Sequence, residues 1–314
     1  MASSISKTIG IVDVETSHPQ SWIPILKQMG YMVKGIYDSG LRYSRDELRE
    51  FADHHGVSNI YTELDTLAEN VDVALILSVN WDVHLQHLQP FLERNKPVLI
   101  DKPLIGTVRD ARWLLRLEQV GHLITGGSSL RFSAQLQNLR DRLNSENKQI
   151  RSIYTCCSGH PFYQGSHLIS LLQGLLGKGI TQVRCLQVEP WKMELEWIGG
   201  QRAIVEVFPE EVGYLPFSAV VITGQGIECL TLSDAESLYA DFLGEVIPML
   251  VGGKQPVPLA ELLEVELACI AGLQSNESAG SWIGLDRLAL DSPAFDGVAF
   301  AEEYLARFNR GGAT

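Results

Sequence analysis

A short run around Lys102 places a charged side chain in a stiff turn at a position suited to chemistry. Residues 97–100 form a short apolar run, which predicts a strand buried on both faces. Asp101, Lys102 and Pro103 follow at once, and the proline ring restricts the turn because it fixes φ. Open α/β sheets bind ligands at the carboxyl ends of their strands, so Lys102 is placed to meet a ligand. An ordinary surface lysine in a strand-to-helix loop is the alternative.

The chain around Lys102 alternates between apolar strands and amphipathic helices. We expect strands at residues 8–12, 31–37, 71–77, 97–100 and 123–125, and helices at residues 22–29, 45–55, 83–94 and 108–119. Thr107 has the side chain and position of an N-cap for the helix after Lys102. This alternation predicts βαβ units, and therefore a Rossmann-type doubly wound parallel sheet in a first domain of residues 1–126.

The second half of the chain has a different pattern. Residues 182–232 alternate between apolar and polar side chains over four or five long segments, which is typical of antiparallel strands. Further elements are expected at residues 132–143, 150–158, 163–176, 239–251, 259–275 and 282–285, with a tail helix at 299–308 to which the sequence assigns no role. Residues 127–314 are therefore predicted to form an α+β domain with a large, mostly antiparallel open sheet.

Composition excludes several classes of function. The 314 residues are 45% hydrophobic, carry a net charge of −13 and contain no run of Lys and Arg, so binding to nucleic acid or an anionic membrane is not expected. No apolar run reaches the roughly 18 residues that span a bilayer, and the N-terminal segment lacks a signal-peptide core. The cysteines follow no zinc spacing or disulfide pattern, which predicts reduced thiols in a cytoplasmic protein: Cys156, Cys157, Cys185, Cys229 and Cys269.

The stretch KPVLIDKPLIGT, residues 96–107, resembles the Glu-Lys-Pro motif of the Gfo/Idh/MocA family of nicotinamide-dependent oxidoreductases, with Asp101 in place of the usual Glu. Other pieces that resemble the family occur in the same order: Asp38, the loop from Asn80 to His84, Arg131-Phe132 and Gly165-Ser166-His167. The resemblance implies an NAD-dependent oxidoreductase that acts on a small molecule. It also implies a homodimer or homotetramer assembled through the face of the second sheet.

Several residues are expected to contact the cofactor. Asp38 ends the second strand, where a carboxylate can accept hydrogen bonds from the adenosine ribose and would repel a 2′-phosphate. It therefore favours NAD over NADP, unless it is only a solvated turn residue. The resemblance places Asn80, Trp81 and His84 near the nicotinamide ribose, where Trp81 is either a stacking surface or a half-exposed packing residue. Asp101 and Lys102 complete this side of the expected site.

The first turn departs from the family pattern. A dinucleotide fold has G-x-G-x-x-G there, but the three glycine positions hold Asp13, Glu15 and His18. Two carboxylates beside a pyrophosphate are costly. Either the loop bends away and the helix start near Ser17 and Ser21 holds the phosphates, or the cofactor binds weakly along a shifted path, or it is absent.

From this turn, the residues expected at the cofactor are Asp13, Val14, Ser17 and His18. A metal site built from Asp13, Glu15 and His18 is not expected. Capping of the loop by Asp13, Thr16 and Ser17 explains the same residue types.

The expected substrate site lies on the helix that opens at Tyr163. Residues 163–170 resemble the family's D-x-G-x-H-x-x-D helix, which implies that His167 keeps the role of the catalytic or substrate-binding histidine. Tyr163 stands where the family has its first Asp, and a tyrosine can donate a proton when a nearby lysine ammonium lowers its pKa. Lys102, Tyr163 and His167 are therefore the catalytic candidates. Arg131 and His160 are expected to contact the substrate with them.

Two hypotheses follow. In the first, hydride moves between NAD and a carbon that bears a hydroxyl, carbonyl or imine, Lys102 polarises the substrate oxygen, and His167 or Tyr163 carries the proton. In the second, the chain is a non-redox relative, either a binding or regulatory protein or a cofactor-free lyase or isomerase. Lys102, His167 and Asp38 favour the first hypothesis. The glycine-free first turn favours the second, and the sequence does not name the substrate.

Overall fold

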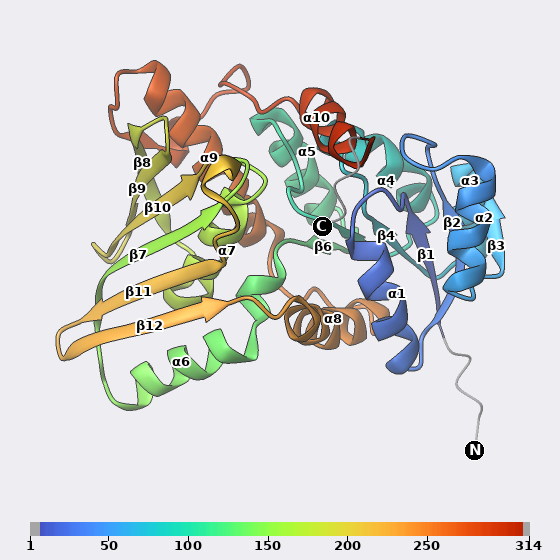
Figure 1. The fold of residues 1–314 in the computed structure, drawn as a ribbon, viewed down its shortest axis with the longest axis horizontal. Coiled ribbons are helices and arrows are strands. Elements are labelled where there is room, and N and C mark those ends of the chain that lie inside the picture. Colours follow the sequence, from blue (N-terminus) through green and yellow to red (C-terminus); the bar gives the residue numbers. More distant parts are fainter. Residues whose placement is uncertain (1–6, 310–314) are drawn as a thin grey trace.

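The first sheet is parallel throughout and has the strand order of a Rossmann fold. The computed structural model describes residues 7–309, and its first sheet has the order β3-β2-β1-β4-β5-β6. The strands are β1 (Thr8–Val12), β2 (Met32–Tyr37), β3 (Asn59–Tyr61), β4 (Val73–Ile76), β5 (Val98–Ile100) and β6 (Ile124–Gly126). Figure 1 shows this sheet with helices on both faces. The predicted doubly wound parallel sheet is confirmed.

The helices of this half begin and end at local signals. They are α1 (His18–Gln28), α2 (Arg45–His54), α3 (Leu64–Asn70), the short η1 (Trp81–Val83), α4 (His84–Glu93) and α5 (Val108–Gln119). The Thr107 hydroxyl accepts a hydrogen bond from the Asp110 backbone N–H at 3.1 Å, which confirms the predicted N-cap. Ser44 and Glu47 form a capping box at the start of α2. The Thr107 cap fixes the start of the helix that follows Lys102 in the chain.

In the first half of the chain, two elements were not predicted, and one helix begins more than two residues from its predicted start. Strand β3 and helix α3 were not predicted, because β3 is three residues long with Asn59 and Ile60 exposed and so has no buried alternation to detect. Helix α1 begins at His18 rather than Trp22. Pro19 lies in its first turn, where a proline is pre-organised for a helix and its missing N–H costs nothing.

The second sheet has seven strands and is mostly antiparallel, as predicted. Its order is β12-β11-β7-β10-β9-β8-β13, and β7 with β10 is its parallel pair. The strands are β7 (Ile150–Ser158), β8 (Ile180–Gln187), β9 (Trp191–Trp197), β10 (Arg202–Phe208), β11 (Phe217–Thr223), β12 (Gly226–Leu232) and β13 (Ile283–Gly284). The other elements of this half are η2 (Ser129–Phe132), α6 (Ala134–Ser145), α7 (Gly165–Leu176), η3 (Glu210–Val212), α8 (Ala235–Val251), α9 (Leu259–Glu277), η4 (Leu285–Arg287) and α10 (Gly297–Asn309).

One face of the second sheet packs against helices, and the other carries ion pairs. Helices α7 and α9 pack on the inner face. Side chains on the outer face pair across strands: Arg184 with Glu194, Lys192 with Glu206 at 2.7 Å, and Arg202 with Glu196 at 3.0 Å. We expected more apolar surface on these strands than one layer of helices could cover. The outer face is instead largely charged, although Leu186, Ile198 and Ile222 are exposed on or beside these strands.

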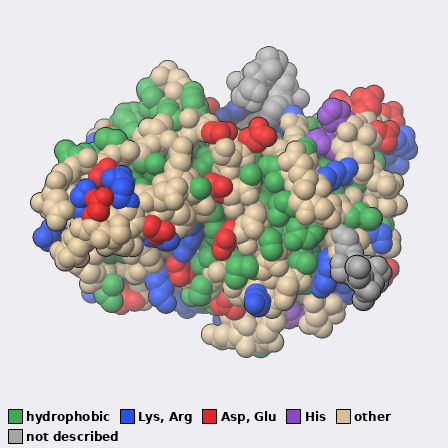
Figure 2. Space-filling model, turned by 90° about the horizontal axis from the view of Figure 1, so that it is seen from below, with side chains coloured by type: hydrophobic (Ala, Val, Ile, Leu, Met, Phe, Trp, Pro, Cys, Tyr) green, Lys and Arg blue, Asp and Glu red, His purple; other side chains and the backbone are tan. Residues whose placement is uncertain are grey.

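Helix α8 returns from the second half of the chain to the first sheet. Its Phe242, Val246 and Ile247 are buried in one core with Ile9, Ile11 and Trp22 of the first half: they belong to a single cluster of apolar side chains. The ring centroids of Trp22 and Phe242 are 5.5 Å apart. Figure 1 shows α8 beside α1, and Figure 2 shows the molecule from below, where basic and acidic side chains are interspersed. The spatial unit around the first sheet therefore includes segments from beyond residue 126.

The strand before the crossing to the second half ends in close backbone contact. Gly126 has φ of +158°, and a Cβ atom there would lie 1.9 Å from the Ile100 carbonyl oxygen, so only glycine fits. The five cysteines are free thiols in the structure. Within residues 7–309, no helix has the length and apolar character that a membrane span needs.

Candidate active site

Lys102 lies at the carboxyl end of β5, between the two sheets, and is almost completely buried. Its side chain is only 4% exposed. The Lys102 ammonium nitrogen lies 3.0 Å from the centre of the Tyr163 ring, which is a close cation–π contact. Burial lowers the pKa of Lys102 to about 7, although Asp101 and Cys157 act in the opposite direction. A lysine of this kind can exchange a proton near neutral pH.

Asp101 holds the turn and pairs with a histidine of the first turn. Its carboxylate accepts a hydrogen bond from the Lys102 backbone N–H at 2.8 Å and is in direct contact with the Nδ1 atom of His18. Burial alone would raise the pKa of Asp101, but the charge and hydrogen bond of His18, together with Lys102, keep it below its usual value. The structure thus brings together three residues that the sequence predicted separately for the cofactor site.

The relation between Lys102 and Tyr163 differs from the one we expected. The ammonium lies against the face of the ring rather than at the phenol oxygen. Burial, with the charges of Tyr304 and Asp101, raises the pKa of Tyr163 well above its usual value. The expected acidification of this phenol by lysine is therefore wrong. Tyr163 instead forms the surface on which the lysine head group lies.

His167 is on the first turn of α7 and is oriented by a serine. Its Nδ1 atom is 2.6 Å from the Ser128 hydroxyl, and the side chain is buried. Burial, with the charges of Lys102 and His18, lowers the pKa of His167 well below its usual value. The imidazole is therefore neutral at physiological pH. The sequence did not predict the contribution of Ser128, which lies in the crossing after Gly126.

The two carboxylates of the first turn, which would repel a pyrophosphate, are turned inward. Asp13 has φ of +64°, the left-handed region that glycine would otherwise occupy and that Asp tolerates. Its carboxylate accepts hydrogen bonds from the Ser39 backbone N–H and hydroxyl at 2.8 Å each and contacts the Ser78 hydroxyl, while His87 Nδ1 lies 3.3 Å away. Burial would raise the pKa of Asp13, but His87, Ser78 and Ser39 lower it below its usual value.

Glu15 is the second carboxylate of the turn and is fully buried. It accepts a hydrogen bond from the Val79 backbone N–H at 2.8 Å, at the end of the β4 strand. Burial, followed by the negative charges of Asp13 and Asp38, raises the pKa of Glu15 to about 8. Glu15 is therefore largely protonated at neutral pH. The sequence suggested two adjacent negative charges in this turn, and only that of Asp13 is present at neutral pH.

Asp38 keeps its place at the end of β2, but its oxygens already have partners. One accepts from the Val14 backbone N–H at 3.0 Å and the other from the Gly40 backbone N–H at 2.8 Å. Burial and the charge of Asp13 raise its pKa. Val14 thus lies in the turn as predicted. The carboxylate of Asp38 links the first turn to the second strand.

The start of α1 lacks a side-chain cap. Ser17 is its N-cap residue but makes no side-chain capping bond, and the His18 backbone N–H donates to the Thr16 hydroxyl at 3.2 Å. The side chain of His18 is turned toward Asp101 and stacks on Trp22 with ring centroids 4.9 Å apart. Of the three arrangements that the sequence left open, the inward bend of the carboxylates describes this turn, and the binding of phosphates at the start of α1 stays a prediction.

The loop after β4 is packed rather than open. Trp81 is 2% exposed, so it is neither a stacking surface for a ligand nor half-exposed. Asn80 accepts a hydrogen bond from the Asp82 backbone N–H at 2.9 Å. Both ring nitrogens of His84 face backbone carbonyl oxygens, those of Leu104 at 3.1 Å and Ser78 at 3.0 Å. His84 is fully buried and joins the β4 loop to the Lys102 turn instead of facing a ligand.

The two remaining residues of the expected substrate site have protein partners. Arg131 pairs with Glu261 and donates to Gln173 at 3.0 Å. The Nδ1 atom of His160 accepts from the backbone N–H groups of Phe162 and Tyr163, both at 3.2 Å. Burial lowers the pKa of His160 to about 4, so this ring is neutral. His160 holds the chain that enters α7.

Another buried carboxyl, which the sequence did not single out, supports the Lys102 turn. Glu266 of α9 accepts a hydrogen bond from the Leu104 backbone N–H at 3.0 Å, and burial raises its pKa to about 7. A glutamate at a helical spacing from apolar residues such as Leu262, Leu263 and Ile270 is a signal that could have revealed it. Within residues 7–309, no group of three His, Cys, Asp or Glu side chains is arranged to hold a metal ion.

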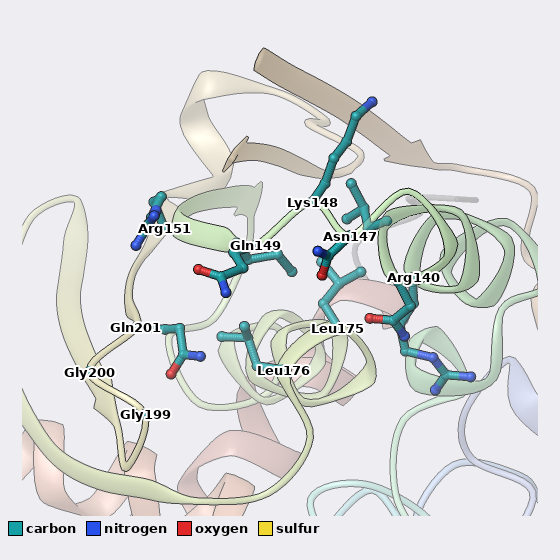
Figure 3. Close-up of a pocket in the computed structure, with 13 residues that line it drawn as sticks. Arg140, Asn147, Lys148, Gln149, Arg151, Leu175, Leu176, Gly199, Gly200 and Gln201 are labelled. Carbon is teal, nitrogen blue, oxygen red and sulfur yellow. The ribbon is translucent and has the colours of Figure 1, made fainter. Parts of the chain in front are cut away.

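A small cavity of about 90 Å³ reaches His167, with Tyr214 and Phe217 around it, and two larger cavities lie elsewhere. One of about 500 Å³ is lined by α6, the end of α7 and the turn between β9 and β10, with Asn147, Gln149 and Gln201 around it (Figure 3). Another of about 590 Å³ lies between α3 and α4, against Tyr37. Lys102, Tyr163 and His167 are all less than 10% exposed, so the chemical groups are covered in this state of the molecule.

A Rossmann sheet with a buried lysine at its carboxyl edge, joined to an open antiparallel sheet, defines a two-sheet α/β protein of the dinucleotide-binding class. Residues 9–125 match the model of a family described as an oxidoreductase family with an NAD-binding Rossmann fold. This part of the chain is similar to the NAD-binding Rossmann fold of the Gfo/Idh/MocA oxidoreductases. None of the curated proteins matches it.

Solved structures share the fold over nearly the whole chain. A "probable dehydrogenase" from Thermotoga maritima is 17% identical with a TM-score of 0.77, and the match covers 90% of this chain and 100% of that one. Scyllo-inositol dehydrogenase from Lactobacillus casei, with bound NAD(H) and scyllo-inositol, is 14% identical with a TM-score of 0.75 and coverage of 90% and 99%. Myo-inositol dehydrogenase from the same organism is 15% identical with a TM-score of 0.73 and coverage of 89% and 97%.

Proposed function

We propose that this protein is an NAD-dependent oxidoreductase that transfers hydride between the nicotinamide and a hydroxyl, carbonyl or imine carbon of a small polar substrate of cyclic or sugar-like type. The observation that carries this proposal is the buried Lys102 at the carboxyl end of β5, with its pKa near 7 and with Tyr163 against it. The match of residues 9–125 to the model of an NAD-binding oxidoreductase family supports it.

The residues present fit a dinucleotide at its phosphate end. The carboxylates of Asp13 and Glu15 are fully buried and turned inward, and the start of α1 at Ser17 has no side-chain cap. Backbone donors at a helix N-terminus can hold phosphates. We assign Ser17 and the first turn of α1 to the pyrophosphate, and Asp38 to the adenosine ribose, which favours NAD over NADP. The nicotinamide would supply or accept the hydride.

The protein's own side chains move one proton, that of the substrate hydroxyl. In the oxidation of a hydroxyl, the neutral Lys102 amine accepts the hydroxyl proton, and in the reverse direction its ammonium returns it. Tyr163 holds the lysine head group against its ring. His167, neutral and fixed through Nδ1 by Ser128, is assigned to a second hydroxyl of the substrate. The exclusion of water from this buried site strengthens these electrostatic interactions.

A non-redox relative is the second candidate, and the side chains at the glycine positions of the first turn favour it. In that case Lys102 and His167 would serve a cofactor-free lyase or isomerase, or a binding or regulatory protein. The two candidates differ in a property that can be measured directly, since only the first binds a dinucleotide. NADH binding followed by fluorescence therefore separates them.

A variant of Asp38 makes the test of dinucleotide binding more specific. We expect the wild-type protein to bind NADH more tightly than NADPH, because the carboxylate repels the 2′-phosphate. Asp38→Ser should narrow the preference, whereas Asp53→Ser on the exposed face of α2 should leave it unchanged. Titrations with both dinucleotides measure the ratio directly. A wild-type preference for NADPH would show that Asp38 does not face the ribose, and the absence of binding to either dinucleotide would favour the non-redox candidate. With NAD⁺, scyllo-inositol and myo-inositol are suitable first substrates for an activity assay.

We also propose that the protein assembles as a homodimer or homotetramer through the outer face of the second sheet. The ion pairs on this face hold Glu194 and Glu206 at less than 10% exposure, beside exposed apolar side chains such as Ile222. Light scattering at micromolar concentration should give a mass of two or four chains, and a monomeric mass would contradict this proposal. The free thiols lead us to propose a cytoplasmic location.

A further inference from the structure

The tail helix α10 lies over the carboxyl edge of the first sheet. After β13 and η4, the chain leaves the second sheet and returns to the first half, where α10 lies beside α4 and above β4 (Figure 1). Helix α10 contacts η1, the loop that follows β4. The sequence assigned no role to this helix. Its position is that of a ligand in an open α/β sheet, outside the carboxyl ends of the strands.

The entry to α10 is fixed at three points. The Phe295 ring stacks on Phe162 with centroids 4.2 Å apart and an angle of 2°. The Phe295 carbonyl oxygen accepts a hydrogen bond from the Trp81 indole at 3.0 Å. The Gly297 backbone N–H donates to Asp82 at 2.9 Å. The beginning of α10 is thereby seated on the loop that the family resemblance places near the nicotinamide ribose.

Phe300 of α10 closes the site above Lys102. The Lys102 ammonium lies on the Tyr163 ring, Phe300 stacks on that ring at 4.7 Å and 28°, and Trp81 stacks on Phe300 at 5.0 Å and 27°. Phe300 is 4% exposed, as is Lys102. One turn further on, the Tyr304 ring lies 6.1 Å from the Tyr163 ring, and burial, with the charges of Asp101 and Glu15, raises the pKa of the Tyr304 phenol. Tyr304 thus extends the cover over the Lys102 turn, at the edge of the sheet where a dinucleotide would lie.

We propose that α10 is a lid that occupies the dinucleotide groove and that the cofactor and α10 exclude one another. This inference rests on the proposed function, because it assigns the covered groove to NAD. It explains why the catalytic candidates are buried although a substrate must reach Lys102. Opening moves a helix that is held by hydrogen bonds at its N-terminal end, by the rings of Phe300 and Tyr304, and by an ion pair of Arg307 at its far end.

The composition of α10 suits a helix that can detach. Its outer face is exposed at Val298, Glu302 and Glu303. Its far end is held by the partly exposed ion pair of Arg307 with Glu210, and Arg307 also pairs with Glu303 within the helix. Exposed ion pairs contribute little to stability, so the aromatic contacts of Phe300 and Tyr304 supply most of the closing energy. Terminal elements with few buried contacts open at lower free energy than the core.

Loosening the lid in the full-length chain tests the proposal. If only the open state binds NADH, its apparent Kd is the intrinsic Kd divided by the open fraction. We expect the double variant Phe300→Ala, Tyr304→Ala to bind NADH about 10-fold more tightly than the wild type or better. Val298→Ala, an exposed position on the same helix, should bind within about twofold of wild type. Equal or weaker binding by a folded double variant would overturn the proposal, because it would show that these rings contribute to the site instead of blocking it.

Hydrogen exchange supplies a readout that does not depend on cofactor affinity. In the free wild-type protein, amides of residues 297–307 should exchange at least about 100-fold faster than those of the buried α9, and NADH should speed them further. Exchange of α10 at the rate of α9 would overturn the lid, since the helix would then open only on global unfolding. If no variant binds NADH, the oxidoreductase proposal fails, and this comparison alone decides whether α10 is a detachable cover.

Discussion

Replacement of Lys102 by methionine is expected to lower turnover by about 10²-fold or more, the usual effect of losing an acid–base or electrostatic group. Methionine keeps a stem that can pack on the Tyr163 ring and removes only the titrating amine. Because the charged lysine is buried at a cost, the variant should be as stable as the wild type or more so. Lys178→Met, at an exposed position after α7, is the matched control and should turn over normally. Near-normal turnover of Lys102→Met would remove this residue from the mechanism.

The pH dependence of the same reaction carries a second signature. The pKa of Lys102 is lowered to about 7, and the neutral amine is the form that accepts a proton. For the oxidation of a hydroxyl, kcat/KM should therefore rise as pH passes through about 7, and the reverse reaction should lose rate over the same interval. Lys102→Met should remove this inflection from the profile. An unchanged inflection in the variant would assign it to another group.

The second large effect is expected at Glu15, in folding stability. Its pKa is raised from 4.5 to about 8, so the folded state binds this proton more tightly than the unfolded state. Below pH 4.5 both states are protonated. As pH rises from 4.5 to 8, the unfolded state loses the proton first, and stability falls by an amount on the order of a few kcal/mol. Glu15→Gln keeps an acceptor for the Val79 backbone N–H and removes the titration.

Thermal unfolding at two pH values measures this effect. Near pH 8.5 the Glu15→Gln variant should unfold several degrees above the wild type, since about 1 kcal/mol corresponds to about 2–4 °C in a chain of this size class. Near pH 5 the two proteins should unfold at similar temperatures. Glu50→Gln, on the exposed face of α2, should show no difference at either pH. A Glu15→Gln effect that is equal at both pH values would mean that this carboxyl does not titrate between them.

The first turn shows why local sequence gave an incomplete account of the site. The sequence placed Asp13 and Glu15 at glycine positions and correctly identified a conflict with two negative charges. The partners that resolve it, Ser39, Ser78 and His87, lie on segments that are distant in the chain. No periodicity or spacing in the first turn points to them. The direction of a buried carboxylate is set by donors that only the folded sheet brings into reach.

The sequence by itself determined the elements whose signals are local. The buried strands β1 and β5, helix α5 with its Thr107 cap, and the alternation of the second half follow from hydrophobic period and capping, which act within a few residues. The same holds for Lys102, because the end of a buried strand and a proline turn are both visible in twelve residues. The family resemblance added Asp38 and His167 as candidates, and their roles stay predictions.

Tertiary structure decided the features that depend on contacts across the chain. It placed the Lys102 ammonium on the face of Tyr163, which leaves the phenol with a raised pKa, and it buried Trp81 under Phe300. It also brought α10 from the end of the chain onto the edge of the first sheet. These outcomes depend on desolvation and on the relative orientation of distant side chains. Neither quantity is encoded in the spacing of residues along one segment, so both had to come from the packed molecule.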